Sequence, residues 1–206
     1  MPSISHFEIY KPAEPCALTG DKLAQTMDKI VKDCLTPDGR ELTLKGYCVG
    51  LNGMTVFAED DRLAKLKRLN LGGNRIGDDG VKVLAESPLF SKVNWLELGG
   101  NDIGPEGIRA LVHSPILGRV KTLNLYRNFI KDEGAILLAK ENRLEKLEEL
   151  DLAQNEIGDP GLLELAQSKR FPNLVAVYLD NNFTSFDAKE SARSYPNFKK
   201  LQSLNL

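Results

Sequence analysis

The chain has 206 residues, with 27 Lys and Arg, 29 Asp and Glu, and 42% hydrophobic residues. It is long enough to bury a sizeable core, and this composition argues against a disordered chain. The net charge of −2 comes from well-mixed charges and leaves no electrostatic footprint for nucleic acid or an anionic membrane. No apolar run reaches the roughly 18 residues that a membrane span needs. We therefore expect a folded protein with no nucleic acid and no membrane among its partners.

Residues 1–40 come before the first regular unit. Apolar residues at helical spacing predict a helix from about Gly20 to Leu35, with Thr19 as its cap. Thr36-Pro-Asp-Gly39 then predicts a turn into the first strand. We interpret residues 1–40 as an N-terminal arm of about 17 residues and a capping helix that covers the end of the array.

The three cysteines are Cys16, Cys34 and Cys48. An odd number at these spacings fits neither a disulfide framework nor a zinc site. The first residues also lack the basic start and apolar segment of a classical secretory signal. Together these features predict a reduced, cytoplasmic setting.

From residue 41 the chain repeats every 27 residues, without insertion or deletion. Each unit has an L-x-L pair, whose alternation predicts a short strand with one buried face. Glycines and a run of apolar residues at helical spacing follow the pair and predict a turn and a helix. The pairs are Leu42/Leu44, Leu69/Leu71, Leu96/Leu98, Leu123/Leu125, Leu150/Leu152, Val177/Leu179 and Leu204/Leu206. Units of this kind bury their apolar faces only against neighbouring units, which predicts a solenoid with a parallel sheet.

An asparagine stands three residues after most of these pairs, where the chain leaves the strand. Its amide can bond backbone groups of the turn, and stacked amides would satisfy polar groups that neighbouring repeats bury. The recurring residues are Asn74, Asn101, Asn128, Asn155 and Asn182. The first unit departs from the pattern with Tyr47, and Lys131 replaces one of the glycines.

The pattern L-x-x-L-x-L-x-x-N-x-I-G-x-x-G-x-x-x-L-A resembles the leucine-rich repeat proteins of the ribonuclease-inhibitor-like class, over residues from about 39 to 206. This resemblance implies an α/β solenoid shaped like a horseshoe, with a concave parallel β-sheet and convex helices. It implies about six to seven units within residues 41–206. It also implies a protein-binding role, because most members of that family act in this way.

Alternate residues of each strand point away from the core, onto the concave face. Three large aromatic residues lie there among charged residues, which is the composition of a protein-binding hot spot. Aromatic residues also stabilise exposed sheets by cross-strand packing, so both interpretations stay open. The predicted partner-binding residues are Arg68, Trp95, Glu97, Asn124, Tyr126, Glu149, Asp151, Tyr178 and Asp180. Arg68 is one strand from Trp95 and is expected to stack on it.

No group of residues in the sequence suggests catalysis or metal binding. The pairs Gly72-Gly73 and Gly99-Gly100 recur in phase with the repeat and lack the spacing of a phosphate-binding loop. Neither His6 nor His113 has the partners of a catalytic triad. The acidic residues of the concave face have no His or Cys beside them, and a flat sheet converges poorly on a cation. We therefore expect no enzyme, no cofactor and no metal.

The leading hypothesis is a non-enzymatic interaction module that binds a protein on its concave face. One form of it is a bacterial effector that acts on a host protein in the host cytosol, since injected proteins also lack a classical signal peptide. The alternative is a regulator, of the activating-protein type, of a small GTPase, because some proteins with similar repeats accelerate nucleotide hydrolysis. The chain stops at Leu206 inside a seventh strand, and an open edge there also predicts self-association.

Overall fold

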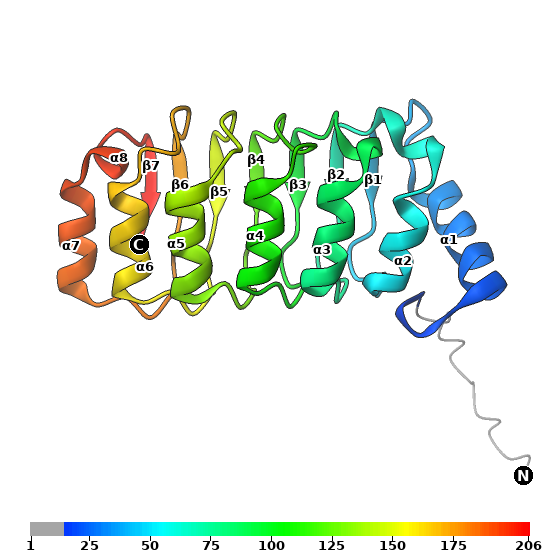
Figure 1. The fold of residues 1–206 in the computed structure, drawn as a ribbon, viewed down its shortest axis with the longest axis horizontal. Helices are drawn as coiled ribbons and strands as arrows, with labels where there is room; N and C mark the ends of the chain where they lie inside the picture. The colour runs from blue at the N-terminus through cyan, green and yellow to red at the C-terminus, as the bar shows by residue number, and fades with distance from the viewer. Residues whose placement is uncertain (1–14) are drawn as a thin grey trace, which may run out of the picture.

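The computed structural model describes residues 15–206 and shows a single array of two layers, strands on one side and helices on the other (Figure 1). Neighbouring strands are parallel, and their order in the sheet is their order in the chain. The strands are β1 (Glu41–Thr43), β2 (Arg68–Asn70), β3 (Trp95–Glu97), β4 (Thr122–Asn124), β5 (Glu149–Asp151), β6 (Ala176–Tyr178) and β7 (Ser203–Asn205). The predicted α/β solenoid is confirmed.

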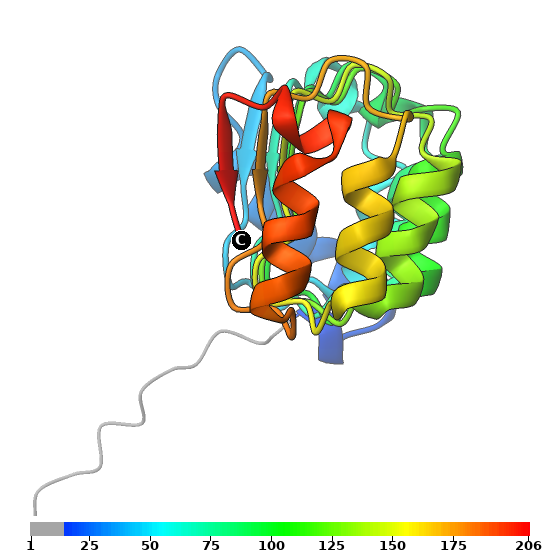
Figure 2. The same ribbon diagram turned by 90° about the vertical axis from the view of Figure 1, so that its left-hand side faces the viewer.

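Helices cover one face of the sheet and leave the other face open (Figure 2). The helices of the described chain are α1 (Gly20–Cys34), α2 (Gly50–Phe57), α3 (Gly77–Glu86), α4 (Pro105–His113), α5 (Lys131–Glu141), α6 (Asp159–Gln167), α7 (Phe186–Ser194) and the short α8 (Pro196–Lys199). Three 3₁₀ turns complete the described chain: η1 (Pro15–Ala17), η2 (Asp61–Lys65) and η3 (Pro88–Phe90).

The register of the sheet stacks equivalent leucines on one another. Leu42 pairs with Leu69 and Leu69 with Leu96, so that paired residues are 27 positions apart. These leucines and their partners two residues later are almost completely buried against the helices. At roughly 1.5–3 kcal/mol for each fully buried leucine, this continuous apolar layer is the main source of stability.

A ladder of asparagine side chains runs along the strand-to-helix turns. The Asn74 amide nitrogen donates to the carbonyls of Leu44 and Leu71, at 2.7 Å each, and its Oδ1 accepts the N–H of Val49. The Asn74 N–H donates to Oδ1 of Asn101, the equivalent residue of the next unit, at 2.8 Å. The first four asparagines are buried, as the sequence predicts, and Asn182 is partly exposed. Each amide therefore bridges two units and satisfies polar groups that water cannot reach.

The same turns hold residues in the left-handed region of backbone conformation, and one of these positions recurs in every unit. In the first units this residue is a glycine: Gly46, Gly73 and Gly100 have φ of 76°, 70° and 65°. In the later units, Arg127 and Gln154 adopt φ of 54° at the equivalent positions. A side chain in this conformation costs roughly 1–2 kcal/mol, so at this position the later turns carry strain that the early turns avoid. Two residues further on, the early turns also hold left-handed side chains, those of Cys48, Arg75 and Asp102.

The N-terminal end of the core is covered by α1. Its residues Leu23, Met27, Ile30 and Val31 are buried, and the helix ends at Cys34, close to the predicted boundary. Thr19 occupies the N-cap position, but its side chain makes no capping hydrogen bond. The predicted turn is present, with the Gly39 N–H donating to the Thr36 carbonyl at 2.8 Å. Residues 1–14, which hold most of the predicted arm, lie outside the described residues.

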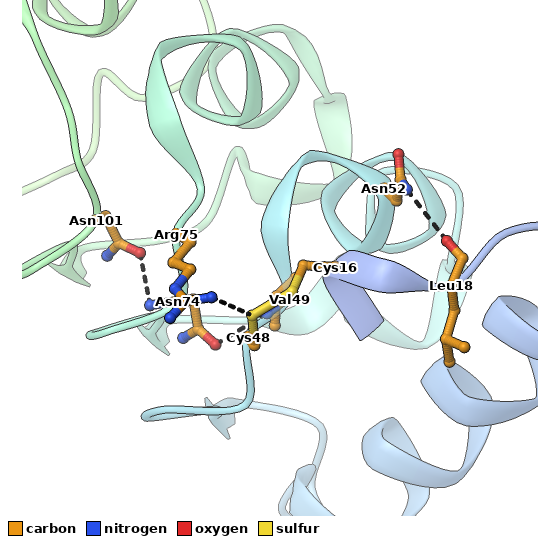
Figure 3. Close-up of a disulfide and its surroundings, with 8 residues drawn as sticks. All are labelled: Cys16, Leu18, Cys48, Val49, Asn52, Asn74, Arg75 and Asn101. Carbon is orange, nitrogen blue, oxygen red and sulfur yellow. Dashed lines mark hydrogen bonds between the residues drawn. A yellow bond between two sulfur atoms is a disulfide. The ribbon is translucent and has the colours of Figure 1, made fainter. Parts of the chain in front are cut away.

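A disulfide joins Cys16 of η1 to Cys48, at the turn before α2 (Figure 3). The sequence-based expectation that the cysteines form no disulfide is therefore wrong. The two Cα atoms are 5.6 Å apart, and the Cys16 N–H also donates to the Cys48 carbonyl at 2.7 Å. Asn52 of α2 secures the same segment through a hydrogen bond to the Leu18 carbonyl at 3.1 Å. Cys48 is buried, and only Cys34 has a free thiol among the described residues.

Candidate functional site

The candidate site is the open sheet face, which corresponds to the predicted concave face. Every predicted partner-binding residue lies on a strand of this sheet or two residues beyond one. The register arranges them in rows across neighbouring strands. One row runs from Glu41 through Arg68 and Trp95 to Thr122 and Glu149. A second row contains Asn70, Glu97, Asn124, Asp151 and Tyr178.

Arg68 and Trp95 form the best-defined contact of the face. The Arg68 guanidinium carbon lies 4.2 Å from the centre of the Trp95 ring, so the predicted stacking is confirmed. Glu41 approaches the other side of Arg68, with 3.7 Å between the carboxylate and guanidinium nitrogen. A cation over a partly exposed aromatic ring contributes about 0.5–1 kcal/mol or somewhat more. The pair fixes a broad, amphipathic surface on β2 and β3.

Side chains of the second row also accept hydrogen bonds from backbone N–H groups just after their strands. The Asn124 Oδ1 accepts the N–H of Tyr126 at 2.8 Å, and the Asp151 Oδ1 accepts that of Ala153 at 2.9 Å. Glu97 accepts the Gly99 N–H in the same way at 2.6 Å. These side chains therefore close the turns after their strands, a structural role that the sequence analysis did not assign to them.

Two carboxylates of this row are electrostatically unfavourable in the isolated protein. Burial raises the pKa of Glu97, and the nearby charge of Asp151 raises it further, while the Gly99 N–H opposes the shift. Burial also raises the pKa of Asp151, and Asp180 adds to this effect. A cationic group placed over Glu97 and Asp151 would favour their ionised form.

The three aromatic side chains do not form one cluster. Trp95 lies on β3, and Tyr178 lies on β6 in the other row. Tyr126 follows β4 and is 39% exposed, whereas Trp95 and Tyr178 are half-buried. They are therefore separate anchor points along the face, which suits an extended contact better than a single pocket.

The acidic residues occupy the middle and C-terminal strands of the face. Glu149 on β5 is exposed, and Asp180, just after β6, is half-buried. Within residues 15–206, no three His, Cys, Asp or Glu side chains are grouped as metal ligands would be. In the same part of the chain, no helix is long and apolar enough to cross a bilayer.

Sequence reasoning did not find a second charged surface, because the charges were taken as well mixed along the chain. Along the loops that lead from helices into strands, cationic side chains surround a shallow hollow of about 240 Å³. We call this surface the basic edge; its cations are Lys67, Lys92, Arg119, Lys121 and Lys146. Lys92, Arg119 and Lys146 are each 27 residues apart, so reading the residue before each strand's apolar column would have found them.

Three segments of the array are similar in sequence to a known protein family. Residues 62–85, 93–112 and 143–166 match the family described as "Leucine Rich repeat". The chain carries leucine-rich repeats. These matches, together with the parallel sheet, identify the array as a leucine-rich repeat solenoid, and the domain type generally mediates protein–protein interaction.

Two solved structures are similar to this leucine-rich repeat array. The C-terminal domain of tropomodulin from Caenorhabditis elegans shares 16% identity with a TM-score of 0.54, covering 71% of this chain and 89% of that domain. An internalin from Listeria monocytogenes shares 24% identity with a TM-score of 0.49 and is covered over 36% of its length by 71% of this chain. No curated protein matches the sequence. The tropomodulin likeness supports the fold alone.

Proposed function

We propose that this leucine-rich repeat array binds a protein partner through its open sheet face and performs no catalysis. The observation that carries the proposal is the contrast between the two sides of each strand. The leucines pointing inward are nearly the same in every unit. The outward positions change from unit to unit and include Trp95, Tyr126 and Tyr178. A surface that serves only to cover the sheet has no need of this diversity.

The electrostatics of the face favour a partner that presents cationic side chains to β3, β4 and β5. Burial, and to a lesser extent the charge of a neighbouring carboxylate, raises the pKa of both Glu97 and Asp151, so their ionised forms carry an electrostatic penalty. A lysine or arginine of the partner would remove this penalty, and aromatic residues nearby would supply apolar contact area. Arg68, held by Trp95 and Glu41, is positioned to meet an acidic group at the other end of the face.

A capture experiment from eukaryotic cell lysate, read by mass spectrometry, tests the proposal. The test variant replaces Trp95, Tyr126 and Tyr178 with Ala. A matched control replaces Phe129, Phe183 and Phe186, which are 48%, 72% and 76% exposed but lie off the sheet face, with Ala. We expect a protein that the wild type and control retain and the test variant loses. Identical profiles for all three folded proteins would contradict the proposal.

The biological setting is a separate hypothesis. A bacterial effector that meets a host protein would use the same face, and a translocation reporter fused to the chain tests that setting directly. A silent reporter in a competent donor strain would contradict it. The Cys16–Cys48 disulfide removes the cysteine argument for a reducing cytoplasm. Nothing within residues 15–206 specifically favours the small-GTPase regulator, so we do not propose it.

A further inference from the structure

The basic edge lies along the loops that connect helices to strands, on the upper side of the array in Figure 1. Its cations come from four successive units, and the side chains surrounding the hollow all lie just before β2, β3, β4 or β5. Adjacent strands are about 4.8 Å apart, so the charges are brought into a compact group rather than spread along the molecule.

Few carboxylates offset this charge. Lys121 pairs with Glu148, whose carboxylate oxygen is 2.6 Å from the ammonium nitrogen. Among residues 15–206, the other four cations of the basic edge make no ion pair. All five cationic side chains are exposed, so they keep the freedom to turn toward a ligand. Like charges this close repel one another, and a bound anion would relieve that repulsion.

The side chains around the hollow also provide the appropriate hydrogen-bond donors. Arg119 offers the planar fork that matches two oxygens of a phosphate, and lysine ammonium groups can meet the remaining oxygens. Asn94, half-buried between Lys67 and Lys121 in its column, adds an amide. A hollow of about 240 Å³ surrounded by several cations suits a small ligand with clustered charge better than a long acidic chain.

We propose that the basic edge binds a compact ligand that carries several phosphate groups. The ligand is either a free polyphosphorylated molecule or the headgroup of a phosphorylated lipid, since the chemistry presented to the protein is the same. This site is distinct from the open sheet face, and its occupancy does not depend on the protein partner proposed above.

Titration calorimetry on the full chain tests this proposal with inositol hexakisphosphate as the probe. The test variant replaces Lys92, Arg119 and Lys146 with Ala. The control variant removes the same charge from exposed positions on α1 and α3, by Lys22→Ala, Lys29→Ala and Lys82→Ala. Circular dichroism first establishes that both variants are folded.

We expect the wild type to bind the probe, the test variant to bind at least about tenfold more weakly, and the control to stay within about twofold of the wild type. No binding by the wild type would overturn the proposal. Equal weakening in both variants would also overturn it, because the binding would then follow total charge. A hexa-aspartate peptide that binds as tightly as the probe would show a site for acidic protein segments instead.

The two sources of the phosphate chemistry are separated by flotation with phosphatidylcholine vesicles, with and without phosphatidylinositol bisphosphate. Binding only to the phosphorylated vesicles, lost with Lys92, Arg119 and Lys146, would support a lipid headgroup. Probe binding in solution without vesicle binding would support a free ligand. A protein that binds neither probe nor vesicles would contradict the proposal in both forms.

Discussion

The strand-to-helix turns and the open sheet face are built from the same repeat, yet they follow opposite rules. In the turns, the same asparagine recurs from unit to unit; the first four are buried, and hydrogen bonds link Asn74 to Asn101, Asn101 to Asn128 and Asn155 to Asn182. On the sheet face, outward residues such as Arg68, Trp95 and Thr122 share one row and no chemistry. Regularity thus marks what the solenoid needs to fold, and irregularity marks where a partner can be recognised.

The largest expected loss of stability comes from opening the disulfide at the N-terminal end of the array, beside the turn before α2. Cys16→Ser opens a disulfide between residues 32 positions apart, and loop-closure entropy then predicts a loss of about 3–4 kcal/mol. Urea titration of the wild type, Cys16→Ser and the control Cys34→Ser measures this. Only the Cys16 variant should behave like the wild type treated with dithiothreitol. An unchanged unfolding midpoint in Cys16→Ser would show that the disulfide does not hold the cap.

The next largest expected loss of stability comes from the asparagine ladder. Asn128→Ala removes the amide that donates to the Leu98 and Leu125 carbonyls and accepts the N–H groups of Asn101 and Ile103. Leaving such groups unpaired costs about 1–3 kcal/mol. The control Thr122→Ala, on the sheet face, should change the free energy of unfolding by less than about 0.5 kcal/mol. Equal losses in the free energy of unfolding of the two variants would contradict a structural role that is specific to the asparagines of the turns.

A smaller effect of opposite sign is expected where the turns carry strain. Gln154 holds a left-handed φ of 54° at the position where an earlier unit has Gly100. Gln154→Gly relieves the steric cost of the side chain and should stabilise the protein by about 0.5–1 kcal/mol. Thermal unfolding of this variant beside Gly100→Ala, which should be destabilised, measures both directions. A loss of stability in Gln154→Gly would contradict our inference that the left-handed conformation of Gln154 is strained.

The smallest predicted effect concerns the sheet face and depends on pH. Glu97 has a raised pKa because it is partly buried near Asp151, so its ionised form weakens the fold. That penalty is present at neutral pH and disappears as pH falls into the range just above the ordinary value of 4.5, where Glu97 takes up a proton. Glu97→Gln keeps an acceptor for the Gly99 N–H. It should therefore be more stable than the wild type at pH 7, with a difference that shrinks on acidification. A difference in stability between the variant and the wild type that stays constant across this pH range would contradict the raised pKa of Glu97.

The repeat made much of the fold predictable. The spacing of the leucines specified the strands and their register, and the recurring asparagines specified the buried ladder. The contact between Arg68 and Trp95 followed from the same register. The disulfide did not, because the pairing of Cys16 with Cys48 depends on where η1 packs against α2, which no periodicity describes.

The pattern of apolar and polar residues does not predict two further features of the structure. The left-handed conformations of Arg127 and Gln154 are imposed by neighbouring units, since these residue types alone do not favour them. Similarly, Glu97 was predicted as a binding residue from its outward position, but its bond to the Gly99 N–H depends on side-chain geometry. The basic edge, in contrast, could be predicted from the sequence by comparing residues that are 27 positions apart.

Site-specific photo-crosslinking tests the central claim most directly. A benzophenone amino acid at Thr122, in the row between Trp95 and Glu149, samples the middle of the open sheet face. The same group at Lys82 of α3 samples the helical side. We predict that a partner captured by the wild type crosslinks from position 122 and not from position 82. Crosslinking from position 82 alone would place the partner on the helices and contradict the account.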